Sequence, residues 1–300
     1  TPLTWAAQMW LFLAFALAFG VKAPVVPLHT WLPDAYGQAP LPVTLLLAGV
    51  LSKMGVYGLI RFCLPLFPDA VALLRPWFWL LAIVGLLYGS LLALAQRDMV
   101  RLLAYSSLAH VGLIVAGVLA ANAQGVQGAL LLSVSHGVTV AALFAAVFFL
   151  EQRRGTRLAA DYGGLWRTMP LFGTLFLIVA LAAIGLPGLS GFPGEFTILV
   201  GIFRVSPAAT GFAVLGIVLA AWFMLSLFRQ VFAGPSTRAE NRLLPDLRRG
   251  EVVLLLPLVI LTFVLGLLPN LILAPSAASV EAALAQAEEN RTVLVEPGSE

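Results

Sequence analysis

Stretches of about 20 consecutive apolar residues recur along this chain, and they limit its possible folds more than any other feature. A helix needs about this length to cross the roughly 30 Å hydrocarbon core of a bilayer. Hydrophobic residues make up 61% of the chain and charged residues 10%, whereas a soluble domain carries about 25% charged residues. The runs are apolar throughout and do not alternate as barrel strands do. The sequence therefore predicts an all-α polytopic membrane protein.

About eight membrane-spanning helices are expected, because proline, glycine or charged residues bound each apolar run. Glycines and prolines interrupt the sixth run, and a polar, acidic tail follows the last one. The expected spans are 5–26, 41–62, 77–95, 102–121, 126–150, 171–203, 211–232 and 252–271.

The arginines indicate how these spans are oriented. If successive loops alternate between the two membrane faces, the arginines divide unequally, and the richer face is cytoplasmic by the positive-inside rule. The C-terminal tail then lies on the outer, periplasmic side. The richer face holds Arg97, Arg101, Arg153, Arg154, Arg157, Arg167, Arg229, Arg238, Arg242, Arg248 and Arg249, and the other holds Arg61, Arg75, Arg204 and Arg291.

Several classes of protein are excluded by composition. The net charge of +3 is scattered between the spans, so no nucleic-acid footprint is expected. Cys63 is the single cysteine, and no Cys or His cluster has metal, haem or iron–sulfur spacing. Glycines recur every three residues over 185–194 but match no nucleotide-binding pattern. The chain begins without methionine, which we expect of a piece of a longer protein.

Two segments break the helical pattern at or near membrane depth. Pro24 and Pro27 lie three residues apart in the first, and Pro187 and Pro193 lie among glycines in the second. Proline removes a backbone donor and clashes with the preceding turn. Irregular backbone is tolerated in a membrane only where protein buries it or where it lines a cavity, and a pair of broken helices indicates a transport site. The alternative for each segment is an ordinary proline kink or the end of a span.

The only two lysines, Lys22 and Lys53, lie inside predicted spans, whereas the arginines lie mostly in or beside loops. Charging Lys53 near the middle of its span costs roughly 3 kcal/mol. A buried lysine can exchange its proton, which arginine does not do. We therefore interpret Lys53 as a proton carrier. The alternative is a genome that prefers arginine, with two incidental lysines.

Lys22 stands beside the first break and needs an anion nearby. Asp34 is the closest carboxylate in sequence, but we expect it at the surface beyond Pro33. Residues 27–35 are expected to form an interfacial loop with Trp31 in the headgroup belt. A carboxylate upstream of this chain is the better candidate partner for Lys22.

Three further ionisable residues lie in predicted spans. His110 follows Ser106 and Ser107 by about one turn, and His136 follows Ser133 on the same helix face. Imidazole titrates near neutral pH, so the pair suggests a hydrated proton path. Glu195 directly follows the second break and is a proton site by default if it lies within the membrane. The alternatives are interhelix hydrogen bonds for the histidines and a water-facing helix end for Glu195.

Four longer motifs give the chain a resemblance to a known family. They are KAPVVPLHTWLPDAY at 22–36, LSKMGVYGLIR at 51–61, RLLAYSSLAHVG at 101–112 and GLPGLSGFPGEF at 185–196. In this order they resemble the antiporter-like membrane subunits of respiratory complex I, the proton-pumping NADH:quinone oxidoreductase. The chain is most similar to the M type, mitochondrial subunit 4. Lys-Met-Gly-x-Tyr-Gly surrounds Lys53, and glutamate stands at position 195 where the L and N types carry lysine.

The resemblance implies a fourteen-helix subunit of two inverted five-helix repeats, each with one broken helix, in which this chain begins at the seventh helix. Residues 1–62 would then end the first repeat, with a broken helix and the Lys53 helix. Residues 77–232 would form the second repeat, with its break at 185–195. Residues 252–271 would be the final membrane helix, and 272–300 the polar tail.

The family's proton-transfer residues carry over by the same resemblance. Lys22 matches the lysine of the seventh helix, and Lys53 matches the central lysine of the eighth. His136 matches the connecting residue of the eleventh helix, Glu195 the terminal residue of the twelfth, and His110 a polar position in the tenth. The glutamate that pairs with the first lysine belongs to the family's fifth helix, upstream of this chain.

The resemblance predicts a proton-translocating membrane subunit, driven by quinone reduction elsewhere in the complex. It implies no cofactor in this chain, and NADH, FMN, iron–sulfur clusters and quinone in other subunits. The implied partners are neighbouring L- and N-type subunits and the lipid of a bacterial inner (plasma) membrane. Two alternatives stay open: a subunit of a multisubunit Na⁺/H⁺ antiporter, which shares these motifs, and a non-pumping structural membrane scaffold.

Overall fold

The computed structural model describes residues 3–235 and 238–295, so residues 1–2 of the predicted first repeat and 296–300 of the tail lie outside it. Within the described ranges the chain forms helices and connecting turns without any strand, and one isolated β-bridge joins Asp98 to Leu158. The expected all-α class is confirmed.

Seven helices of the described chain are long and apolar enough to cross a membrane. The remaining expected span, the sixth at 171–203, is split into two short helices, α9 (Pro170–Ala183) and α10 (Gly191–Phe203). The predicted number of about eight crossings therefore agrees with the structure. The seven are α1 (Trp5–Lys22), the continuous stretch Leu41–Leu66 that contains α3 to α5, α6 (Pro68–Ala95), α7 (Met99–Leu119), α8 (Ala123–Arg154), α11 (Pro207–Val231) and α12 (Arg249–Leu267).

Polar and small residues set several of the helix ends. Asp98 caps α7, because its Oδ1 accepts hydrogen bonds from the backbone N–H groups of Val100 at 2.7 Å and Arg101 at 3.1 Å. Asn122 caps α8 in the same way, and α8 ends at Gly155, whose φ of 73° suits glycine. The third expected span, 77–95, lies within a longer helix. Helix α6 begins at Pro68 and continues through Pro76, which membrane helices tolerate.

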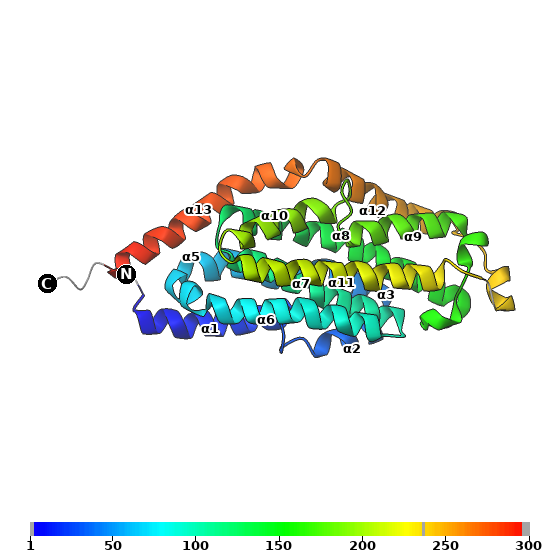
Figure 1. The fold of residues 1–300 in the computed structure, drawn as a ribbon, viewed down its shortest axis with the longest axis horizontal. Coiled ribbons are helices and arrows are strands. Elements are labelled where there is room, and N and C mark those ends of the chain that lie inside the picture. Colours follow the sequence, from blue (N-terminus) through cyan, green and yellow to red (C-terminus); the bar gives the residue numbers. More distant parts are fainter. Residues whose placement is uncertain (1–2, 236–237, 296–300) are drawn as a thin grey trace.

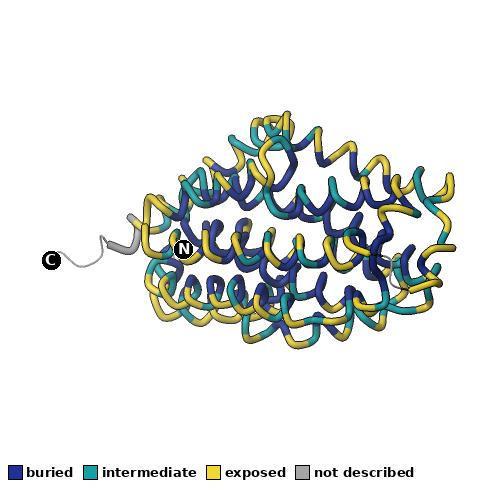
Figure 2. Tube along the Cα trace, turned by 45° about the vertical axis from the view of Figure 1, so that its right-hand side comes forward, coloured by how far each residue is buried: buried dark blue, intermediate teal, exposed yellow. Residues whose placement is uncertain are grey.

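Helix α7 lies at the centre of the bundle, between α6 and α8, and nearly all of its side chains are buried (Figure 1). Figure 2 shows the buried positions running through the middle of the bundle, with exposed positions around them. Small residues allow this close packing. A Cβ added at Gly112 of α7 would lie 2.5 Å from the Ala82 carbonyl oxygen of α6, so these backbones are nearly in contact.

Several connections between the long helices lie at the two opposite ends of the bundle, whereas the two helix breaks lie between these ends (Figure 1). Residues 155–169 lie together with 232–235 and 238–248 at one end, where the Trp166 backbone N–H donates to the Phe232 carbonyl at 3.0 Å. At the other end Arg204 reaches Gln124 Oε1 at 3.1 Å. Helices α12 and α13 (Asn270–Val295) form an arc over one side of the bundle (Figure 1).

The first helix break separates α1 from the short helix α2 (Trp31–Gln38). The expected interfacial loop at 27–35 was therefore wrong from Trp31 onward. Pro33 lies in the first turn of α2, where a missing N–H costs nothing. The Trp31 indole Nε1–H donates to the Val21 carbonyl at 3.1 Å, so this side chain ties α2 to the end of α1.

One largely buried ion pair connects α8 to α12 at the arginine-rich end of the bundle. The Arg153 guanidinium of α8 binds both Glu251 carboxylate oxygens of α12, and it donates to the carbonyls of Pro245 at 3.0 Å and Phe149 at 2.9 Å. The exposed fraction of the two charged side chains is 7% for Arg153 and 15% for Glu251. Removing one partner would leave the other charge buried and uncompensated.

We predict that Arg153→Ala lowers the free energy of unfolding by about 3–5 kcal/mol, the usual cost of breaking a buried pair. Arg167→Ala is the matched control, because Arg167 is an exposed arginine at the same end of the bundle. Thermal unfolding of the full-length protein in detergent measures both changes. Equal Tm values for the two variants would contradict the prediction.

Candidate functional site

Lys53 lies in α4 (Ser52–Gly58), which two single π-helical turns flank, η1 (Leu47–Leu51) and η2 (Leu59–Cys63). Its Nζ donates to the Ala48 carbonyl at 2.5 Å and lies 3.1 Å from Ser52 Oγ. π-helical turns disturb the regular backbone ladder and occur often at functional sites. The Ala48 carbonyl in this turn accepts from both the lysine and the Ser52 hydroxyl.

His136 of α8 completes the surroundings of Lys53. The distance from Lys53 Nζ to His136 Nδ1 is 2.9 Å, which is hydrogen-bonding distance, and Nζ can donate to this ring nitrogen when the nitrogen carries no hydrogen. Glycines make this approach possible. A Cβ added at Gly137 would lie 2.7 Å from the Gly49 carbonyl oxygen, so α8 and the η1 turn cross here with their backbones in contact.

His110 of α7 continues the line of polar groups. Its ring centroid lies 4.8 Å from that of His136, with the two ring planes inclined at 41°. His110 Nδ1 is 2.8 Å from the Ser106 carbonyl, and Nε2 is 2.9 Å from the Ala183 carbonyl at the end of α9. A neutral imidazole carries one N–H, so only the imidazolium donates to both carbonyls at once.

Glu195 lies in the first turns of α10, directly after the second break, and its exposed fraction is 6%. Gly185, with φ of 71°, makes the turn out of α9. A Cβ added at Gly185 would lie 2.1 Å from Glu195 Oε2, so the carboxyl group packs directly against this glycine. The neighbouring Gly194 packs against Leu132 of α8, one turn before His136.

The structure thus joins Lys53, His136 and His110 by direct contacts and leads to the α9–α10 break where Glu195 lies. All four residues were singled out from the sequence. Gly137 was not, although it directly follows His136, and the glycines of 185–194 were noted only for their spacing and as part of the helix break. The Ser133 hydroxyl donates to the Ala129 carbonyl of its own helix at 2.7 Å.

Lys22 is the exposed last residue of α1 and makes no ion pair within the described part of the chain. The residue that follows it, Ala23, packs against Gly55 of α4, so both lysines lie beside the same helix crossing. Asp34 is 63% exposed and pairs with Arg101 at 3.1 Å, which agrees with its expected surface position.

The four prolines lie at the breaks where the sequence placed them. Pro24 and Pro27 belong to the turns between α1 and α2. Pro187 lies in the turn between α9 and α10, and Pro193 lies in the first turn of α10. Across residues 3–235 and 238–295, no three His, Cys, Asp or Glu side chains gather as metal ligands would.

Comparison with known sequences gives one family and many relatives. Residues 2–220 match the family described as NADH:quinone oxidoreductase/Mrp antiporter, transmembrane. The chain is 44% identical over 279 residues to NADH-quinone oxidoreductase subunit M of Rhodobacter capsulatus, covering 92% of this chain and 54% of that protein. For subunit M of Mycobacterium tuberculosis the identity is 41% over 263 residues. The chain therefore spans about half the length of the curated relatives it matches.

Solved structures show the same fold. A chain of respiratory complex I from Thermus thermophilus with bound NADH matches with a TM-score of 0.87 and 34% identity, over 98% of this chain and 60% of that chain. A chain of the Mrp complex from Dietzia matches with a TM-score of 0.81 and 24% identity, over 93% of this chain and 60% of that chain. At that identity the second match shows the fold alone.

Two glycines of the second break allow a matched test of how Glu195 is held. We predict that Gly185→Ala destabilises the protein more than Gly188→Ala. Both positions have positive φ, which costs alanine about 1–2 kcal/mol. Only Gly185 faces the Glu195 carboxyl group, whereas nothing lies within 4 Å of a Cβ added at Gly188. Denaturant unfolding measures the difference, and equal losses would show that the carboxyl group does not depend on Gly185.

Proposed function

This chain belongs to the NADH:quinone oxidoreductase/Mrp antiporter transmembrane family, and from that premise we propose that it is a proton-translocating part of an M-type subunit of NADH:quinone oxidoreductase. The observation that carries the proposal is the 2.9 Å contact between Lys53 Nζ and His136 Nδ1 at a half-buried crossing of two membrane helices. A proton donor and an acceptor at hydrogen-bonding distance can exchange a proton directly.

The proposed transfer starts at Lys53 and runs towards Glu195. The Lys53 ammonium gives a proton to His136 Nδ1 and becomes a neutral amine. The proton then continues by way of His110 to the Glu195 carboxylate. Two observations support this route: the 4.8 Å approach of the two tilted histidine rings, and the contact of His110 with the end of α9. The buried hydroxyls of Ser107 and Ser135 lie near the histidines along α7 and α8.

Lys22 is proposed to control this transfer. A carboxylate from the part of the protein upstream of this chain would pair with it, and a charge change in a neighbouring subunit would alter that pair. An opposite charge about 6 Å away is worth roughly 3 kcal/mol at an effective dielectric constant of 20. Moving one charge against 100 mV requires about 2.3 kcal/mol. The two energies are comparable, so the pair is adequate to drive the step.

The setting of this subunit belongs to the same proposal. NADH, FMN, iron–sulfur clusters and quinone would be bound by other subunits, and quinone reduction there would drive the transfer. Neighbouring L- and N-type subunits and the lipid of a bacterial inner membrane would surround it. The arginine-rich end of the bundle would face the cytoplasm and the C-terminal end of α13 the outside.

A second candidate function is a subunit of a multisubunit Na⁺/H⁺ antiporter. The description of the matched family, which names the Mrp antiporter beside NADH:quinone oxidoreductase, favours it. The composition of the native assembly separates the two functions. Co-purification with NADH-oxidising and iron–sulfur subunits supports the first, and an assembly of membrane subunits alone supports the second.

We predict that Lys53→Ala abolishes proton pumping in the assembled complex while its helices stay inserted. Lys53→Arg should fail as well, because arginine keeps its proton. Met54→Ala is the control, since Met54 is an exposed neighbour on the same helix. The measurement is dye quenching in vesicles that hold the purified complex, energised by NADH and a quinone.

Full pumping by Lys53→Ala would overturn the relay. A non-pumping scaffold would instead be supported if a triple variant with Lys22, Lys53 and Glu195 all neutralised kept normal turnover and normal pumping.

We also predict that Gly137→Ala lowers pumping although it changes no ionisable group. The added Cβ would collide with the Gly49 carbonyl and separate Lys53 from His136. Gly211→Ala is the control, because a Cβ there meets nothing within 4 Å. Vesicle assays of the two variants test this. If both pump equally, the spacing of the crossing does not control the transfer.

A further inference from the structure

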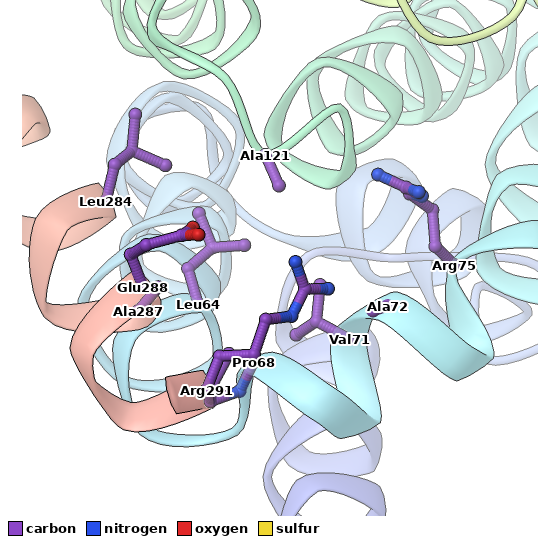
Figure 3. A pocket seen from close by; sticks show the side chains of 10 residues that line it. All are labelled: Leu64, Pro68, Val71, Ala72, Arg75, Ala121, Leu284, Ala287, Glu288 and Arg291. Carbon is purple, nitrogen blue, oxygen red and sulfur yellow. The ribbon is translucent and has the colours of Figure 1, made fainter. Parts of the chain in front are cut away.

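Charges of both signs line the pocket at the end of the bundle opposite the arginine-rich loops (Figure 3). Arg75, Arg291 and Glu288 lie around it, and Arg291 Nε is 3.9 Å from Asp69 Oδ1. Its arginines therefore face carboxylates of the same chain. Two buried hydroxyl groups that lack partners lie elsewhere, on α2 and α7.

The short helix α2 carries one aromatic side chain towards the Lys53 site. Tyr36 of α2 is 1% exposed, and its ring packs edge-to-face on the ring of Phe144 of α8, with the centroids 5.6 Å apart. A buried tyrosine usually has a hydrogen-bond partner for its hydroxyl group. The surroundings of this hydroxyl group therefore bear on what α2 does.

The Tyr36 hydroxyl group lies beside the hydroxyl groups of Ser52 and Ser107. Within the described part of the chain, neither the Tyr36 nor the Ser107 hydroxyl group makes a hydrogen bond. Ser52 Oγ donates to the Ala48 carbonyl at 3.1 Å and lies 3.1 Å from Lys53 Nζ. A hydroxyl oxygen has two acceptor sites, so Ser52 Oγ can accept from Nζ and keep one site free. Tyr36 is placed to donate to the group that contacts the lysine.

Polar contacts hold the C-terminal end of α2, where the last carbonyls of a helix lack partners within the helix. Arg157 Nη1 donates to the Gly37 carbonyl at 2.6 Å, and its Nε donates to Glu151 Oε1 at 2.7 Å. Thr44 of α3 (Leu41–Leu46) donates through Oγ1 to the Tyr36 carbonyl at 3.3 Å. The loop at the arginine-rich end and the helix stretch that carries Lys53 are thereby both attached to α2.

A small cavity of about 80 Å³ adjoins this end of α2, and Tyr36, Thr44, Glu151 and Arg157 line it. Side-chain packing is therefore incomplete where α2 ends, and the polar contacts contribute to its position there. Gly37 directly follows Tyr36 in the chain. A shift of this end would move the Tyr36 side chain with it.

We propose that Tyr36 is a positioning residue of the Lys53 site, whose hydroxyl group holds Ser52 Oγ, and that Arg157 holds the end of α2 that places it. This inference rests on the proposed proton transfer and adds a part to it. With Ser52 held, Lys53 Nζ keeps its 2.9 Å distance to His136 Nδ1. A loop at the end of the bundle is in this way connected to the proton donor.

The alternative is that Tyr36 only fills the core. A buried hydroxyl group without a partner costs free energy, so its removal would then be neutral or stabilising. Pumping would not change. The two interpretations therefore differ in their effect on pumping at equal or higher stability.

The test is Tyr36→Phe in the assembled complex with the full-length protein, because this change keeps the ring and removes only the hydroxyl group. We expect the protons pumped per NADH oxidised to fall about three- to tenfold, the scale of one hydrogen bond. The Tm in detergent should stay the same or rise. Tyr162→Phe is the control, since the Tyr162 hydroxyl group donates to the Thr156 carbonyl at 2.8 Å within the loop at the arginine-rich end. This variant should keep the ratio.

Combining Tyr36→Phe with Ser52→Ala tests the connection between the two hydroxyl groups. If Tyr36 acts through Ser52, the double variant should pump as much as Ser52→Ala alone. Arg157→Gln should also lower the ratio, and Tyr36→Phe should then lower it by a smaller factor than in the unaltered protein.

Losses that multiply independently in the Tyr36–Ser52 double variant would overturn the proposal. Unchanged pumping by Tyr36→Phe, together with loss of pumping in Lys53→Ala, would overturn the role of Tyr36 and leave the proton transfer standing. Full pumping by Lys53→Ala would overturn the transfer itself, and this role with it.

Discussion

Hydrocarbon offers no hydrogen bonds, so the backbone groups of this chain at membrane depth need partners within the protein. Unbroken helices meet this need by themselves, and the irregular places do not. Side chains supply the missing partners there. Trp31 donates to the Val21 carbonyl at the end of α1, His110 contacts the Ala183 carbonyl at the end of α9, and Lys53 donates to the Ala48 carbonyl in a π-helical turn. The polar groups that carry the candidate chemistry also satisfy the interrupted backbone.

Close helix packing converts these separate contacts into one site. Glycine stands next to an ionisable residue at two of the crossings, as Gly137 beside His136 and Gly194 beside Glu195. Gly55, two residues after Lys53, lets Ala23 of the first break approach the same helix. Larger residues would hold the helices too far apart for side chains to reach a group on the next helix. The glycines carry no reactive group, but they set how closely the helices approach and therefore which side chains can make contact.

Much of this arrangement could be predicted from the sequence, because its causes are local. The length of the apolar runs predicted the membrane-spanning helices, and the prolines and glycines predicted both helix breaks. The rarity of lysine in the chain indicated Lys53 as a functional residue. The incorrect predictions concern features that tertiary contacts determine. Residues 31–35 were expected to lie in an interfacial loop, yet they begin helix α2, whose Pro33 lies in a first turn that needs no N–H. The π-helical turns beside Lys53 and the approach of His110 to His136 depend on how α8 crosses its neighbours, which no single segment encodes.

The two backbone carbonyls that contact His110 couple its protonation to the relative position of two helices. They belong to different helices, α7 and α9, and a ring with one hydrogen can serve only one of them at a time. Protonation of the neutral His110 ring is therefore thermodynamically coupled to the distance between α7 and α9 at the second break. By reciprocity, a force that moves the end of α9 changes the proton affinity of the ring by the same free energy. The protonation state of His110 and the contact between α7 and α9 are therefore two aspects of one equilibrium.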